Sequence, residues 1–229
     1  MTNISINKLF QSAHLIYRAQ SNSPEEKEFK RALMTTDSAT YAYSTSRLLS
    51  PPRTEDVDAD MSGPSNNNNT LLSVIIYLPL SDSDSNPNPS IEEEEEDDGT
   101  KEKEGDGKGE EEKKEKMIGC LSLESHLLTR HHRTANLGII MSPSFQGKGH
   151  GTEAINWALD WAFGMAGMHA VRLTTFSYNL RAVRVYERVG FVREGVRRES
   201  LWFDGKWWDH YMYSMLEGEW AALRGRTVA

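Results

Sequence analysis

An acidic tract of low complexity divides this chain and limits how much of it can fold. Residues 81–116 contain 16 acidic and 6 basic side chains, including the unbroken acidic run 92–98. Such a segment buries too little apolar surface to offset the entropy lost when its backbone is ordered. We therefore expect a disordered insertion, either a lengthened solvated hairpin loop or an acidic regulatory arm. The remainder suffices for one core, which we place at 14–217 between an N-terminal extension, 1–13, and a C-terminal tail, 218–229.

The tract also hides the charge of the folded part. The whole chain carries a net charge of −8 and the tract alone carries −10, so the rest carries +2. A slightly basic body can hold an anionic cofactor, whereas no stripe of Lys and Arg is dense enough to indicate nucleic-acid binding.

The cysteine content and hydropathy indicate the compartment. Cys120 is the only cysteine, which excludes an intrachain disulfide and favours a reducing environment. It lies in an apolar stretch, so we expect it to pack as a small apolar residue rather than to act as a nucleophile. No window approaches the ~18–20 apolar residues of a membrane span, and residues 1–11 do not resemble a secretory signal. We expect a cytoplasmic or nucleocytoplasmic protein that binds neither membrane nor nucleic acid.

Hydrophobic periodicity predicts a mixed α/β (α+β) domain. A short strand at 15–19 precedes a helix that Ser23 caps and Pro24 opens, running to about residue 34. Residues 35–64 show no sustained period and indicate a loop with a little helix. The further predicted elements are strands at 71–80, 117–123 and 135–141, a helix after Gly151, a strand at 170–176, a helix at 180–189 capped by Gly190, and a hairpin of strands 199–203 and 206–215 around Asp204-Gly205. Strands joined by helices on the C-terminal side should run parallel, and the earlier strands antiparallel.

The sharpest motif lies between the strand 135–141 and the helix that follows it. It consists of Gln146, Gly147, Lys148, Gly149, His150, Gly151 and Thr152. Alternate glycines let backbone amides turn to one side, and the start of the helix adds unpaired N–H groups with positive partial charge. The motif therefore predicts a phosphate-binding loop. Its spacing fits neither a Walker loop nor the dinucleotide fingerprint, and a flexible strand-to-helix turn remains the alternative.

A second motif occupies the later helix. Asn179 and Tyr186 are two helical turns apart, so their side chains should project from one side. A neutral tyrosine can give a proton to a departing thiolate, and an asparagine can hold an amide-rich chain or a water. The alternative is that Tyr186 is a core aromatic whose hydroxyl is capped.

With these two motifs the sequence resembles the GNAT superfamily of N-acetyltransferases. The acetyl-CoA motif Gln/Arg-x-x-Gly-x-Gly/Ala is met at 146–151, and the motif Asn-x-x-Ala-x-x-x-Tyr-x-x-x-Gly-Phe is met at 179–191. The segment 194–199 and the hairpin after it look most like the branch of the ribosomal-protein alanine and spermidine acetyltransferases. The resemblance extends from about residue 15 to residue 216, apart from the acidic tract.

The resemblance implies a fold and a reaction. It implies a mixed, mostly antiparallel sheet, flanked by helices and splayed into a V between its fourth and fifth strands. The pantetheine arm of acetyl-CoA would lie in the split, beside backbone groups of Ile140 and Met141, with the pyrophosphate on loop 146–152. Asn179 and Ala182 would adjoin the arm, and Tyr186 would be the general acid. The implied reaction is acetyl transfer from the cosubstrate acetyl-CoA to a primary amine, by direct attack in a ternary complex.

One departure from the family concerns the general base. Many relatives carry glutamate where this chain has Asn136, and an amide cannot take a proton from the acceptor amine. Glu124 and His126 are the substitutes that we would test, although they can equally be an exposed pair at a strand end. No His, Cys, Asp and Glu residues show metal-ligand spacing, so we expect no metal.

Asn136 also supports a rival function, a CoA-binding regulatory or interaction module of weak catalysis, with the acidic arm recruiting partners. Transfer of an acyl group longer than acetyl is a second rival function. The acceptor can be an amine of a small molecule or of a protein. We expect this chain to be a monomer or a homodimer. Three tryptophans of the predicted hairpin can pack in the core, form an interface with a second subunit or line the acceptor site: Trp202, Trp207 and Trp208.

Overall fold

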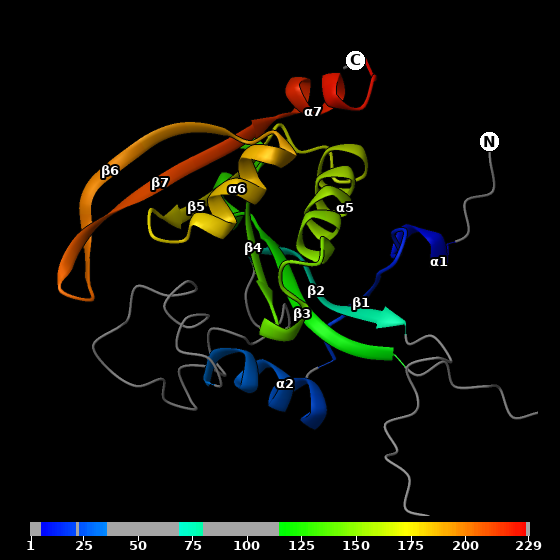
Figure 1. The fold of residues 1–229 in the computed structure, drawn as a ribbon. Coiled ribbons are helices and arrows are strands. Elements are labelled where there is room, and N and C mark those ends of the chain that lie inside the picture. The colour runs from blue at the N-terminus through cyan, green and yellow to red at the C-terminus, as the bar shows by residue number, and fades with distance from the viewer. Residues whose placement is uncertain (1–5, 22, 36–68, 80–114, 228–229) are drawn as a thin grey trace, which may run out of the picture.

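The computed structural model describes residues 6–21, 23–35, 69–79 and 115–227 (Figure 1). Most of the predicted loop 35–64 and of the predicted insertion 81–116 lies outside the described residues. Glu115 and Lys116, which we assigned to the insertion, instead open a strand and lie opposite Pro79 and Leu78. Backbone pairing of this kind requires no apolar side chain, which is why composition placed the boundary too late.

Seven strands and several helices make up the described residues. The strands are β1 (Ile16–Ala19), β2 (Thr70–Pro79), β3 (Glu115–Glu124), β4 (Thr134–Met141), β5 (Ala170–Phe176), β6 (Val192–Phe203) and β7 (Lys206–Leu216). The α-helices are α1 (Ile6–Leu9), α2 (Pro24–Thr35), α5 (His150–Gly164), α6 (Leu180–Val189) and α7 (Glu217–Leu223). Two short 3₁₀ helices are η2 (Leu127–His132) and η3 (Pro143–Phe145). None of the helices in the described ranges is long and apolar enough to cross a membrane.

The strands form one mixed sheet in the order β1-β2-β3-β4-β5-β7-β6. All neighbours are antiparallel except β4 and β5, which α5 joins and which run parallel, as predicted. The pairing of β4 with β5 covers only 134–136 against 170–172. Beyond these residues the two strands separate (Figure 1), which confirms the V-shaped splay between the fourth and fifth strands.

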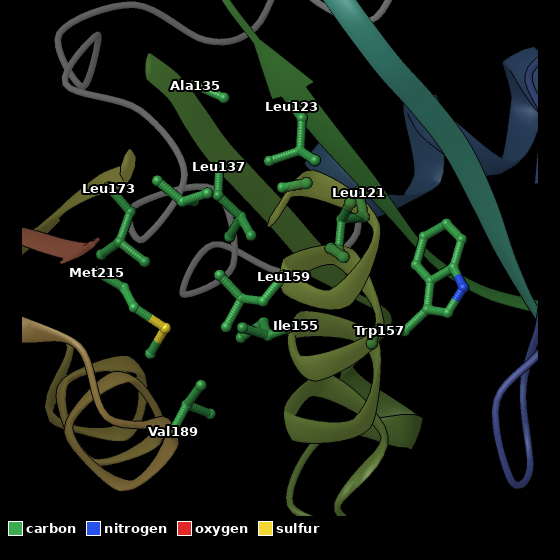
Figure 2. Close-up of a cluster of buried hydrophobic side chains, with 14 of the residues drawn as sticks. Leu121, Leu123, Ala135, Leu137, Ile155, Trp157, Leu159, Leu173, Val189 and Met215 are labelled. Carbon is green, nitrogen blue, oxygen red and sulfur yellow. The ribbon is translucent and has the colours of Figure 1, made fainter. Parts of the chain in front are cut away.

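The main core lies between the sheet and α5. Alternate residues of β3 and β4 point to this side, and Figure 2 shows Leu121 and Leu137 beside Leu159 of α5. The opposite face carries a smaller cluster, in which Cys120 and Leu33 pack together under α2. The sheet is therefore covered by α5 on one face and by α2 on the other (Figure 1).

The C-terminal part differs most from the sequence prediction. Strand β6 begins at Val192, seven residues before the predicted start, because its mostly exposed, charged edge-strand residues show no clear alternation. Residues 217–223 form α7, whose Trp220 and Ala221 enter the main core. The hairpin turn is as predicted: both Asp204 and Gly205 have positive φ, at 51° and 74°, as a type I′ turn requires.

Candidate active site

The splay between β4 and β5 opens a cleft of about 600 Å³, a size usual for ligand sites. Its walls come from both faces of the sheet. Leu137 and Thr175 line it from the α5 side, whereas Glu124 and Thr174 line it from the opposite side. The cleft therefore passes through the sheet, and a ligand that enters on one face can meet a second ligand on the other.

Most of the predicted site residues share this cleft. Its lining includes Glu124, Ile140, Met141, Gln146, Gly147, Gly149, Gly151, Thr152, Asn179, Ala182 and Tyr186. Lys148 and His150 are not among the lining residues, although they belong to the same loop. His126 is not among them either.

The glycine loop has the backbone that its sequence demands. Gly147 and Gly149 have φ of 75° and 91°, and a Cβ at either position would meet no heavy atom within 4 Å. Glycine is therefore needed there for backbone conformation rather than for space. Gly149 is the N-cap of α5, so the first amides of that helix face the loop and can bind an anion. Lys148 adds positive charge beside them, with its ammonium 5.3 Å from the ring centre of Phe145.

Gln146 joins the two sides of the V. Its Nε2 donates to the carbonyl of Met141 over 2.9 Å, and its Oε1 accepts a hydrogen bond from Arg181 of α6. The Met141 carbonyl thus already accepts one hydrogen bond, and its second lone pair stays available to a pantetheine amide. Sequence reasoning missed Arg181, although Arg184 and Arg188 follow it at helical spacing and all three line the cleft.

Tyr186 forms part of the cleft wall. Its side chain is 9% exposed and its ring packs 6.0 Å from that of Phe191 and 6.2 Å from that of Tyr213. Burial raises the pKa of Tyr186 to about 12. The phenol therefore stays protonated throughout the physiological pH range and can donate a hydrogen bond into the cleft.

Asn179 has a structural role alongside its place in the cleft. Its Oδ1 accepts a hydrogen bond of 3.1 Å from the backbone N–H of Ala182, which caps α6. This bond fixes the asparagine side chain and the start of the helix together.

The two candidate bases lie in different places. Glu124 ends β3, lies opposite Asn136 of β4 and lines the cleft. His126 lies beyond the end of this strand and caps η2, its Nδ1 accepting a hydrogen bond of 3.3 Å from the N–H of Leu128. His126 lines a separate cavity. The structure thus brings Glu124, but not His126, into the cleft that holds Tyr186.

The remaining candidates show no sign of a reactive role. In the described ranges, no three His, Cys, Asp or Glu side chains are placed to hold a metal ion. Cys120 lines the cleft, but it is buried and desolvation raises the pKa of its thiol to about 11, so the thiol stays protonated. Trp202 and Trp207 pack edge to face on the β6–β7 hairpin, about half exposed, and with Trp208 they lie outside the cleft lining.

Comparisons with known proteins agree with this geometry. Residues 79–191 match the sequence profile described as Acetyltransferase (GNAT) family. The spermidine N(1)-acetyltransferase of Vibrio cholerae is 40% identical over 78 residues, which cover 34% of this chain and 45% of that protein. The ribosomal protein uS5 alanine N-acetyltransferase of Escherichia coli is 26% identical over 111 residues, 48% of this chain and 57% of that protein. The chain spans about half the length of the curated relatives it matches.

A solved structure extends the likeness to nearly the whole chain. It is a chimera of the spermidine N-acetyltransferase SpeG from Vibrio cholerae and hSSAT, with a TM-score of 0.63 at 21% identity. The match covers 91% of this chain and 98% of that one, which shows a shared fold. The resemblance read from the two motifs is confirmed: residues 79–191 of this chain match the GNAT acetyltransferase family.

Proposed function

We propose that this chain transfers an acetyl group from acetyl-CoA to a primary amine, by direct attack in a ternary complex. The observation that carries the proposal is the cleft through the sheet. It has a glycine loop at 146–152 whose amides can bind an anion, a protonated tyrosine on its wall and Glu124 on the opposite face. Each feature matches one need of the reaction: a seat for a pyrophosphate, a hydrogen-bond donor for a thiolate and an acceptor for an amine proton.

The proposed steps use these residues in turn. Glu124 accepts a proton from the acceptor ammonium, directly or through a water, which leaves a nucleophilic lone pair. The amine attacks the acetyl carbonyl carbon, and a main-chain N–H near Met141 stabilises the oxyanion that develops. The new C–N bond leaves a positively charged nitrogen, which loses its extra proton to water. As the carbonyl re-forms, the C–S bond breaks and its electron pair goes to sulfur. Tyr186 donates a hydrogen bond and then its proton to that thiolate, and regains a proton from solvent.

The direct test is thiol release. The purified protein, incubated with acetyl-CoA and a panel of primary amines, should release free coenzyme A faster with an amine than without, and mass spectrometry should detect the N-acetyl product. Binding of coenzyme A without amine-dependent release from any acceptor would instead favour the rival CoA-binding module. Asn136 is the feature that supports that rival.

Loop 146–152 provides a test of cofactor binding. We expect Gly149→Ala to raise the Kd for coenzyme A about tenfold, because a side chain at φ of 91° costs about 1–2 kcal/mol and forces the amides to turn away. Gly205→Ala is the matched control, because Gly205 also has positive φ with no heavy atom within 4 Å of a Cβ. Calorimetric titration should find weaker coenzyme A binding only for the loop variant. Equal affinities would remove loop 146–152 from the cofactor site.

Localisation and assembly remain predictions. We expect a cytoplasmic or nucleocytoplasmic protein that is a monomer or a homodimer, and light scattering after gel filtration would measure its assembly.

A further inference from the structure

A second cavity lies on the sheet face opposite α5, where β4 meets β5. It has a volume of about 400 Å³. Six polar residues line it: His126, Thr129, His132, Thr134, Asn136 and Arg172. They supply a guanidinium, two imidazoles, a carboxamide and two hydroxyls, and no carboxylate is among them. Every one of these side chains can donate a hydrogen bond.

Arg172 is the fixed positive charge of this cavity. Three arginines of the described chain have carboxylate partners: Arg18 with Glu115, Arg133 with Glu217, and Arg224 with Asp160. The guanidinium of Arg172 forms no ion pair or hydrogen bond with the part of the chain that the structure describes. A guanidinium in a cavity with no carboxylate among its lining side chains suits a carboxylate or phosphate ligand.

His126 contributes a defined donor. Its Nδ1 accepts a hydrogen bond from the N–H of Leu128. In the neutral ring the proton is therefore on Nε2, so this nitrogen is a donor.

The cavity is in register with the cleft. Glu124 of β3 pairs with Asn136 of β4, and Asn136 pairs with Arg172 of β5. Directly paired residues share a face, so the three form one row across the sheet. Neighbouring strands are ~4.8 Å apart, which places the backbones of Glu124 and Arg172 ~10 Å apart. An amine at Glu124 would thus have the cavity within reach of a short chain.

We propose that this second cavity is an acceptor subsite that binds an anionic group, a carboxylate or a phosphate, attached to the amine substrate. The inference rests on the proposed function, since it names the class of acceptor that the cleft would use. A polyamine would instead bring a second ammonium toward Arg172, where two like charges repel.

The test is an acceptor series on one alkyl chain, assayed at low salt. Pentylamine has no second charge, cadaverine adds an ammonium, 6-aminohexanoate adds a carboxylate, and 5-aminopentyl phosphate adds a phosphate. We expect the KM of the two anionic amines to be about tenfold or more below that of pentylamine, and that of cadaverine to be highest. Comparing the two anionic amines shows which group the cavity prefers.

Substitutions test whether the second cavity causes the lower KM of the anionic amines. Arg172→Gln should bring the KM ratio of pentylamine to 6-aminohexanoate close to one, whereas Arg172→Lys should keep part of it. Arg198→Gln removes the same charge from the exposed edge strand β6 and should keep the whole ratio. An equal ratio in wild type and Arg172→Gln would overturn the subsite.

A binding measurement separates this inference from the proposed function. In the presence of coenzyme A, 6-acetamidohexanoate should bind about tenfold more tightly than N-pentylacetamide, and Arg172→Gln should remove the difference. This comparison needs no turnover. Absence of acetyl transfer to any amine would contradict the proposed function, whereas equal binding of the two amides would contradict the subsite.

Discussion

Replacement of Tyr186 by phenylalanine is expected to lower kcat about 100-fold while the Kd for coenzyme A changes less than about twofold. The phenol lines the cleft, and burial raises its pKa to about 12, so it is protonated at every working pH and can donate a hydrogen bond to the departing thiolate. Phenylalanine keeps the ring that packs against Phe191 and Tyr213 and removes only the hydroxyl. The loss should therefore fall on kcat, measured by thiol release at saturating substrates.

Tyr213→Phe is the matched control for this variant. Tyr213 is also buried, and its hydroxyl donates a hydrogen bond of 3.0 Å to Glu187, but it does not line the cleft. We expect this control to lose about 1 kcal/mol of stability and to keep its kcat. Equal kcat values for wild type and Tyr186→Phe would exclude the general-acid role.

Replacement of Gly190 by alanine is expected to reduce the free energy of unfolding by about 3 kcal/mol. Gly190 ends α6 with a φ of 108°, a conformation that costs a residue with a side chain about 1–2 kcal/mol. A Cβ there would lie 2.7 Å from Cδ1 of Leu223, so the side chain of Leu223 at the end of α7 must also move. Urea unfolding followed by circular dichroism would measure the loss.

Gly167→Ala separates the two causes. Gly167 also has positive φ, at 62°, but a Cβ there would meet no heavy atom within 4 Å. This control should lose only about 1–2 kcal/mol, for the backbone conformation alone. A loss at Gly190 no larger than at Gly167 would mean that the contact with α7 does not contribute.

Much of the fold could be predicted because its signals are local. The branched apolar run of β2, the helical spacing in α5 and the Asp204-Gly205 turn each specify their own structure, and all three are as expected. The start of β6 and the existence of α7 depend on tertiary contacts instead. A charged edge strand shows no alternation, and seven residues form a stable helix only when Trp220 and its neighbours are buried.

The candidate site could be predicted as far as its two motifs reach. The glycine loop and α6 carry their own spacing, and the structure places both on one cleft. The bond from Arg181 to Gln146 and the row from Glu124 to Arg172 could not be predicted, since both depend on how distant segments align. The separation of Glu124 from His126 depends on where β3 ends, a boundary that sequence patterns locate poorly.

A crystal structure with coenzyme A is the most direct test of the account. We predict the pyrophosphate against the amides of residues 147–152, the pantetheine arm in the split between β4 and β5, and the sulfur beside the Tyr186 hydroxyl. Coenzyme A bound outside this cleft, or bound with its sulfur away from Tyr186, would contradict it.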